Sequence, residues 1–73
     1  MIPSKSDPKW ERLLQMAETI PVKGLATRML MTRIKMMGWS KSEDRKKEAI
    51  TAAYDFFVKN ESIVKDDIKL IFG

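Results

Sequence analysis

The chain has 73 residues, of which 44% are hydrophobic and 33% charged, and its formal net charge is +4 at pH 7. A chain of this length forms at most one domain, and its apolar content is that of a folded protein rather than a disordered one. The sequence contains no cysteine and no histidine, which excludes disulfides, thiolate nucleophiles, cysteine metal sites and the usual general base.

The first predicted helix spans about residues 7–20 and follows a flexible leader at residues 1–6. Asp7 can accept hydrogen bonds from the first free amides of a helix, and Pro8 suits the first helical position. Apolar residues recur at three- and four-residue steps, as expected of one buried helical face: Trp10, Leu13, Leu14, Ala17 and Ile20. Pro21 ends this helix because proline disfavours helical geometry at the residue before it.

The second predicted helix spans residues 21–37 and ends before Gly38, a residue suited to a left-handed stop. At about 100° per residue, its apolar side chains cover roughly half of the circumference. They are Val22, Leu25, Ala26, Met29, Leu30, Ile34, Met36 and Met37. This arc is wider than a one-sided amphipathic helix requires. Either the helix is central in the bundle, or part of its apolar surface is left for a partner.

The third predicted helix spans about residues 41–59, and Ser40 and Glu43 have the spacing of a capping box at its start. Its expected buried residues are Ala49, Ile50, Ala53, Phe56 and Phe57. Ser62 is a candidate cap for a fourth helix at 62–72. The apolar side of that helix holds Val64, Ile68, Ile71 and Phe72. The short connections predict an all-α fold, a small compact bundle of three to four helices forming one domain over residues 7–73.

Four of the six methionines lie in the second predicted helix: Met29, Met31, Met36 and Met37. Methionine is flexible and is frequent on surfaces that adapt to different ligands, although it also fills cores. Core filling is the favoured interpretation for Met29, Met36 and Met37, and Met36 is also a candidate for partner binding. Met31 projects away from the apolar arc, so we expect it to be an exposed contact residue.

Arg33 and Trp39 are the other candidate partner-binding residues. Arg33 projects into the middle of the predicted apolar arc, so its guanidinium must extend to solvent, find a carboxylate or bond the free carbonyls at the helix end. The functional alternative is an anion site at Arg33. Trp39 has three interpretations: a hydrophobic staple before the cap, a cover over the end of the bundle, or an exposed interface anchor.

The positive charge is concentrated in residues 19–42, which contain five basic residues and no Asp or Glu. The candidate anion-binding or nucleic-acid-binding residues are Lys23, Arg28, Lys35, Lys41, Arg45, Lys46 and Lys47. A helix-turn-helix is not expected, because its second helix needs apolar anchors in its first two turns. Here residues 41–48 are all polar or charged. The remaining nucleic-acid hypothesis is weak, sequence-independent binding to phosphates through the basic 23–47 surface.

The predicted function is a non-enzymatic protein-interaction or regulatory module that binds a partner, or a second copy of itself, through the Met-rich, basic second helix. Weak nucleic-acid binding is the alternative. No serine or threonine has a histidine to activate it, and Asp66 and Asp67 lack further oxygen ligands nearby, so we expect no catalytic residue, metal or cofactor. No apolar run approaches the roughly 18 residues of a membrane-spanning helix. With no signal peptide recognised, we expect a cytoplasmic protein. The least favoured alternative is that the second helix lies on anionic membranes as a basic amphipathic element.

Overall fold

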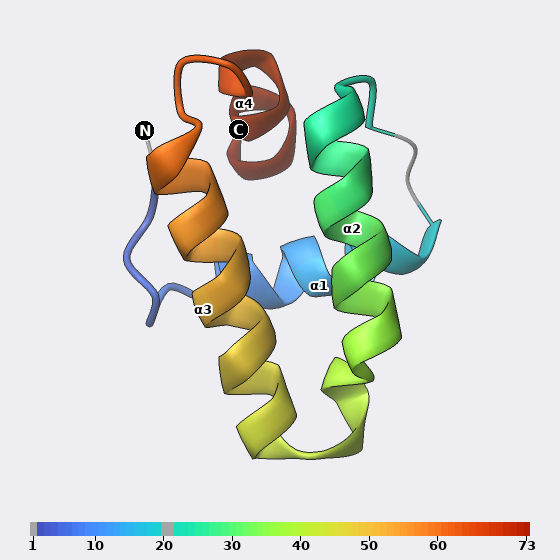
Figure 1. The fold of residues 1–73 in the computed structure, drawn as a ribbon. Helices are drawn as coiled ribbons and strands as arrows, with labels where there is room; N and C mark the ends of the chain where they lie inside the picture. Colours follow the sequence, from blue (N-terminus) through green and yellow to red (C-terminus); the bar gives the residue numbers. More distant parts are fainter. Residues whose placement is uncertain (1, 20–21) are drawn as a thin grey trace.

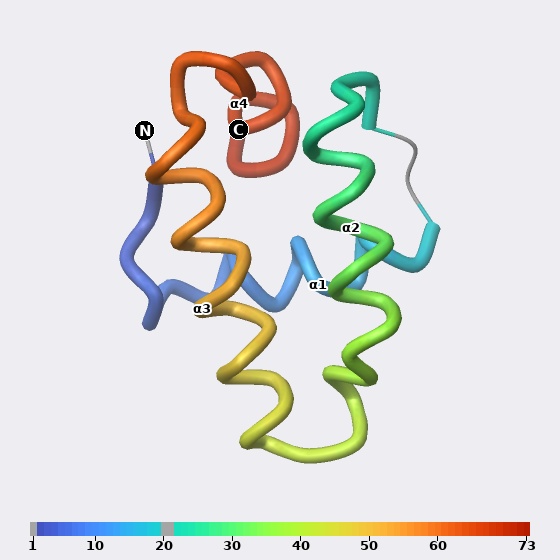
Figure 2. The backbone as a smooth tube through the Cα atoms, in the orientation of Figure 1, coloured from blue at the N-terminus to red at the C-terminus, as the bar shows by residue number. Residues whose placement is uncertain are grey.

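The computed structural model is an all-α bundle, as predicted, and it describes residues 2–19 and 22–73. Four α-helices lie in these residues: α1 (Lys9–Thr19), α2 (Leu25–Met37), α3 (Glu43–Lys59) and α4 (Lys65–Phe72), with a short 3₁₀ helix, η1 (Trp39–Lys41), before α3. Helices α2 and α3 lie side by side, and α1 crosses both (Figure 1). The trace in Figure 2 shows α4 at the end of the bundle where α2 begins and α3 ends.

Helix α1 begins at Lys9, two residues later than predicted, and Asp7 provides its cap. The side-chain oxygen Oδ1 of Asp7 accepts a hydrogen bond from the Lys9 amide at 2.9 Å, as expected of an acidic residue at a helix N-terminus. The predicted end at residue 20 and the stop at Pro21 lie outside the described residues. Trp10, Leu13 and Leu14 are fully buried, as predicted from their spacing.

Trp10 is the centre of the aromatic core. Its ring meets the Phe72 ring edge-on with 4.9 Å between centroids, and it lies 5.9 Å from Tyr54 and 6.0 Å from Phe57. The indole Nε1 donates a hydrogen bond to the carbonyl oxygen of Ser4 at 2.8 Å. Trp10 thus joins three helices and satisfies its polar atom in the segment before α1.

Helix α2 begins at Leu25 rather than at residue 21. Gly24 is its N-cap residue, in an extended conformation and without a side-chain cap. Val22 is buried but precedes the helix. At the other end, Gly38 has φ 64° and ψ 48°, the predicted left-handed stop.

The predicted capping box at the start of α3 is wrong, because Ser42 and not Ser40 is the cap. After Gly38 the chain makes one 3₁₀ turn that takes up Ser40, and the Lys41 amide donates to the Gly38 carbonyl at 3.0 Å. Ser42 then adopts the extended conformation that an N-cap needs, and its hydroxyl accepts from the Arg45 amide at 3.1 Å. Helix α3 therefore begins at residue 43 instead of 41. Ala49, Ala53 and Phe57 are buried, and Ile50 and Phe56 are half-buried against them.

Ser62 does not cap the last helix, which begins at Lys65 with Val64 at the N-cap position. The amides of Ile63 and Val64 both donate to the carbonyl of Asn60, so residues 60–63 form a turn that precedes α4. The predicted buried side of α4 is confirmed: Val64, Ile68, Ile71 and Phe72 are all in the core. None of the helices formed by residues 2–19 and 22–73 has the length and apolar character needed to cross a membrane.

Candidate interaction surface

Helix α2 has two apolar faces. The face toward the bundle holds Thr27, Leu30, Met31 and Ile34, which are all buried. On the solvent side, Leu25, Met29 and Met36 are 71%, 65% and 82% exposed. At 100° per residue, these three side chains project within about 40° of one another, opposite Ile34. We call Leu25, Met29 and Met36 the apolar ridge.

The predicted orientation of this helix is wrong for three of its methionines, Met29, Met31 and Met36. Met31, expected to be an exposed contact, is 5% exposed and belongs to the core. Met29, expected in the core, is on the surface. The predicted apolar arc included Val22, which is not helical, and combined the exposed ridge residues with the buried ones. Its centre therefore lies roughly a quarter turn from the centre of the observed buried face. Met37 is half-buried against the core, as predicted. Met36 is exposed, so its favoured core-filling interpretation is wrong, and its partner-binding role stays a prediction.

Arg33 is exposed and lies beside the apolar ridge rather than within the buried face. Its predicted place in the middle of the apolar arc is therefore wrong, for the same reason as for Met31. Arg28 and Lys35 are exposed on the other side of the ridge. Within the parts of the chain that the structure describes, none of the three is in an ion pair with a carboxylate. The ridge is thus bordered on both sides by cations.

Trp39 is the first residue of η1 and is half-buried, with its side chain packed against the core. This position corresponds to a cover over the end of the bundle, where α2 turns into α3. Trp39 follows Gly38 on the connection between α2 and α3. It is half-buried while Met36 is exposed, so its predicted role as an exposed interface anchor stays a prediction.

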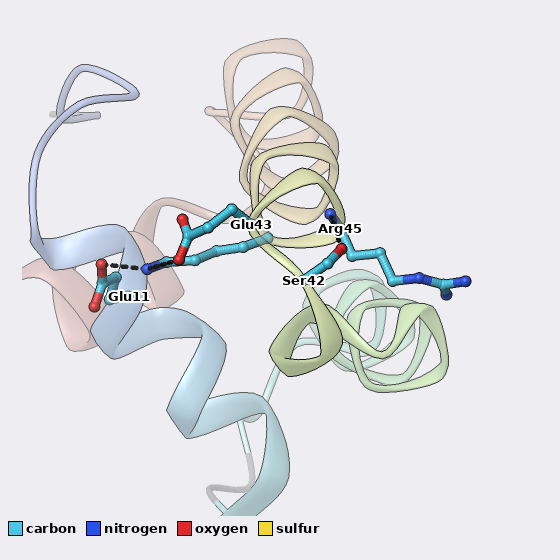
Figure 3. A network of polar contacts seen from close by, with 5 residues as sticks. Glu11, Ser42, Glu43 and Arg45 are labelled. Carbon is cyan, nitrogen blue, oxygen red and sulfur yellow. Dashed lines mark hydrogen bonds and ion pairs between the residues drawn. The ribbon is translucent and has the colours of Figure 1, made fainter.

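Two of the candidate anion-binding residues, Lys46 and Arg45, are engaged within the chain. Figure 3 shows the contacts with Glu11 and Glu43. Lys46 Nζ lies 2.6 Å from Glu11 Oε1 and 3.9 Å from Glu43 Oε1, which joins α3 to α1. The hydrogen bond that Lys46 donates to the Glu11 carboxylate is the main cause that raises the pKa of Lys46 above its ordinary value. Arg45 Nη1 donates to the Met37 carbonyl at 3.1 Å, at the end of α2, where a cation complements the helix dipole.

The remaining anion-binding candidates are exposed: Lys23, Arg28, Lys35, Lys41 and Lys47. They do not form one concentrated site, because they are spread from the start of α2 to the second turn of α3. Glu43, Asp44 and Glu48 are exposed in the same part of α3. The cations with no acidic neighbour in the sequence are therefore those on α2.

The start of α2 holds a second polar feature that the sequence does not indicate. Asp67 of α4 is 6% exposed, and its carboxylate lies so close to Gly24 that a Cβ at that position would collide with Oδ2. Such a carboxylate complements the positive end of the α2 dipole. Thr27, one turn further on, is fully buried, and its hydroxyl has no hydrogen-bond partner among the described residues.

Asp66 and Asp67 border a hollow at the start of α2. A shallow hollow of about 480 Å³ is lined by Lys23, Gly24, Ile63, Asp66, Asp67 and Leu70. Its acidic residues are limited to Asp66 and Asp67, and no cluster of three or more potential metal ligands is present in residues 2–19 and 22–73. Asp66 is exposed while Asp67 is buried against Gly24, so the two carboxylates lie in different environments.

Comparison of the chain with known protein families, curated proteins and solved structures found no match. The apolar ridge with its bordering cations is the surface feature of α2 that points to a function. Leu25, Met29 and Met36 are spaced by four and seven residues in the sequence, but this spacing identifies an exposed ridge only once the buried face of the helix is known.

Proposed function

We propose that this chain is a non-enzymatic protein-interaction module that binds its partner through the apolar ridge of α2. The observation that carries the proposal is the alignment of Leu25, Met29 and Met36 on the face opposite the core. Single exposed apolar residues are normal on protein surfaces and need no explanation. Three aligned on one helix provide a strip that a partner can cover, with the exposed Thr32 between Met29 and Met36.

The energetics of this strip favour association. Fully burying one Leu or Met side chain is worth about 1.5–3 kcal/mol, and all three ridge residues are more than half exposed. The two methionines are flexible and polarizable, so they adapt to the shape of a partner surface. Burial of the strip therefore offers several kcal/mol before the entropy lost on association is subtracted.

The absence of enzymatic activity is part of the same proposal. Without cysteine and histidine, a nucleophile would need activation by lysine or by a carboxylate placed beside it. Among the described residues, the one buried acidic side chain is Asp67, and it faces the backbone of Gly24. Neither the residue composition nor the position of Asp67 supports a reactive centre.

Weak nucleic-acid binding remains the second candidate, because exposed cations follow α2 without an acidic residue between positions 19 and 42. It predicts that affinity for a short DNA or RNA falls steeply as salt increases, with a slope set by the number of phosphates contacted. It also predicts that replacing Met29 or Met36 with lysine strengthens binding. The protein-interaction proposal predicts the opposite for its own partner, because the ridge is then lost.

Site-specific photo-crosslinking tests the proposal. A photoreactive residue at Met36 should capture a defined protein from an extract of the native cells, whereas the same residue at Thr51, exposed on α3, should not. The captured protein is identified by mass spectrometry, purified and titrated against the chain. Met29→Lys should weaken that binding about ten-fold or more, since it removes a buried methionine from the interface.

The matched control is Val58→Lys, which changes an exposed apolar residue of α3 in the same way and should leave the affinity unchanged. Equal capture at Met36 and Thr51, or a purified partner that binds both lysine variants equally well, would contradict the proposal. Sedimentation equilibrium of the chain alone tests whether a second copy is the partner.

A further inference from the structure

We infer that the partner segment is an acidic amphipathic helix that pairs with α2 in the manner of a short coiled coil. The inference rests on the proposed function and names the partner's chemistry. The exposed face of α2 has the spacing of a coiled-coil seam: Leu25, Met29, Thr32 and Met36 follow one another at steps of four, three and four residues. This alternation is that of the a and d positions of a heptad repeat.

The rest of the helix agrees with this register. With Met29 and Met36 at a positions and Leu25 and Thr32 at d positions, the f positions opposite the seam are Thr27 and Ile34. Both of these residues are fully buried in the core. The f side of α2, which faces away from the partner in a coiled coil, is thus buried in the bundle. The a and d side, which would contact a partner helix, is exposed to solvent.

Thr32 is compatible with a place in the seam. It is exposed, and its hydroxyl donates to the carbonyl oxygen of Arg28 at 3.1 Å, so the polar atom is satisfied on its own helix and the methyl group remains for packing. The seam from Leu25 to Met36 is about 16 Å long at 1.5 Å per residue. Its four positions, two a and two d, correspond to the a and d positions of two heptads in a partner helix.

Charge selects the partner. In this register Arg28 and Lys35 occupy g positions and Arg33 occupies an e position, and e and g residues determine which helices pair in a coiled coil. All three are exposed, and none is in an ion pair with a carboxylate in the described residues. A helix with Glu or Asp at its own e and g positions meets opposite charges on both sides of the seam.

A second copy of α2 is a poor occupant in either orientation. In a parallel pair, Arg28 at g faces Arg33 at e of the other copy. In an antiparallel pair, g faces g and e faces e, so Arg28 and Lys35 meet cations again. Like charges placed together across an interface oppose association. Charge complementarity thus favours an acidic helix over self-pairing.

The test uses two helical peptides that differ only in charge. Both carry leucine at a and d and a side-chain staple on the outer face; one has Glu at every e and g position, and its sibling has Lys there. Fluorescence anisotropy with the full chain should show at least about a ten-fold preference for the acidic peptide at low salt. The preference should shrink at high salt, since exposed charges are screened.

Two variants separate the apolar and the ionic contributions. Met29→Lys with Met36→Lys adds positive charge but removes the seam, so binding of the acidic peptide should fall by about ten-fold or more. Arg28→Glu, Arg33→Glu and Lys35→Glu together should reverse the preference toward the basic sibling. This reversal is a gain of binding, which an unfolded variant cannot produce. Val58→Lys serves as the unchanged control.

The inference is overturned if the chain binds both peptides equally or neither, or if the double Met→Lys variant keeps its affinity for the acidic one. It is also overturned if a short DNA duplex or phosphatidylserine vesicles bind more tightly than the acidic peptide in a manner that depends on Met29 and Met36. A crosslinked partner at Met36 that presents no acidic helix leaves the proposed function standing and removes this inference. The absence of both a crosslinked partner and peptide binding removes both.

Discussion

Replacing Thr27 with valine should stabilise the protein, because the Thr27 hydroxyl is fully buried and has no hydrogen-bond partner among the described residues. Burying a hydroxyl without a partner costs roughly 1–3 kcal/mol in proteins. Valine has nearly the same shape and replaces the oxygen with a methyl group, whose burial is worth up to about 0.8 kcal/mol. Both residues are β-branched and have similar helix propensities, so the backbone contribution is nearly unchanged.

We therefore expect Thr27→Val to raise the free energy of unfolding by about 1–2 kcal/mol, after allowing for imperfect packing of the new methyl group. For a domain of this size, each kcal/mol raises the melting temperature by about 4–8 °C. Urea denaturation followed by circular dichroism measures the first quantity, and a thermal scan measures the second.

Thr32→Val is the matched control on the same helix. Thr32 is exposed and its hydroxyl already bonds the Arg28 carbonyl, so this change should alter stability by less than about 0.5 kcal/mol. The reasoning is refuted if Thr27→Val destabilises the protein. That result would mean that the hydroxyl donates to an acceptor such as the neighbouring carboxylate of Asp67, since losing a buried hydrogen bond costs stability.

Three further experiments, with four substitutions, test the fold and its electrostatics. Met31→Ala should lower the free energy of unfolding by about 2–5 kcal/mol, whereas Met29→Ala should change it by less than about 0.5 kcal/mol. Urea denaturation of the two variants then shows which face of α2 is buried. Gly38→Ala should destabilise by about 1 kcal/mol, because alanine disfavours the left-handed conformation at φ 64°, and thermal melting detects it. Because the folded-state pKa of Lys46 is raised above 10.5, its contribution is present below pH 10.5 and lost as the pH rises through the folded pKa. The stability difference from Lys46→Met, measured by urea denaturation across this range, should therefore disappear at high pH.

Local sequence signals predicted the parts of the fold that depend on neighbouring residues alone. Gly38 ends α2 in the left-handed conformation because no other residue type adopts it as readily. The buried side of α4 follows from spacing, since that helix has one apolar face. The cap of α3 was placed two residues early, because Ser40 and Ser42 are both suitable caps. The 3₁₀ turn after Gly38 decides between them.

The orientation of α2 could not be predicted in this way. Its sequence holds one row through Leu30 and Ile34 and another through Met29 and Met36, and either row has the spacing of a buried helical face. Only the packing of α1 and α3 against the helix decides which row is enclosed. Thr27 gave no apolar signal, although it is fully buried.

Residue type alone does not distinguish the two faces of α2. The enclosed face contains Leu30 and Ile34 but also Met31, while the exposed row contains Met29 and Met36. Methionine is flexible enough to fill a core and to adapt to another surface. The exposure of Met29 and Met36, and not their residue type, therefore separates them from Met31.

The cations beside the apolar ridge have a consequence for the free protein as well as for binding. An exposed apolar strip promotes association with other copies, which all carry the same strip. Arg28, Arg33 and Lys35 border it on both sides, so two copies that approach through α2 bring only positive charges together. The cations that we propose attract an acidic helix would therefore also oppose the association of two copies through α2.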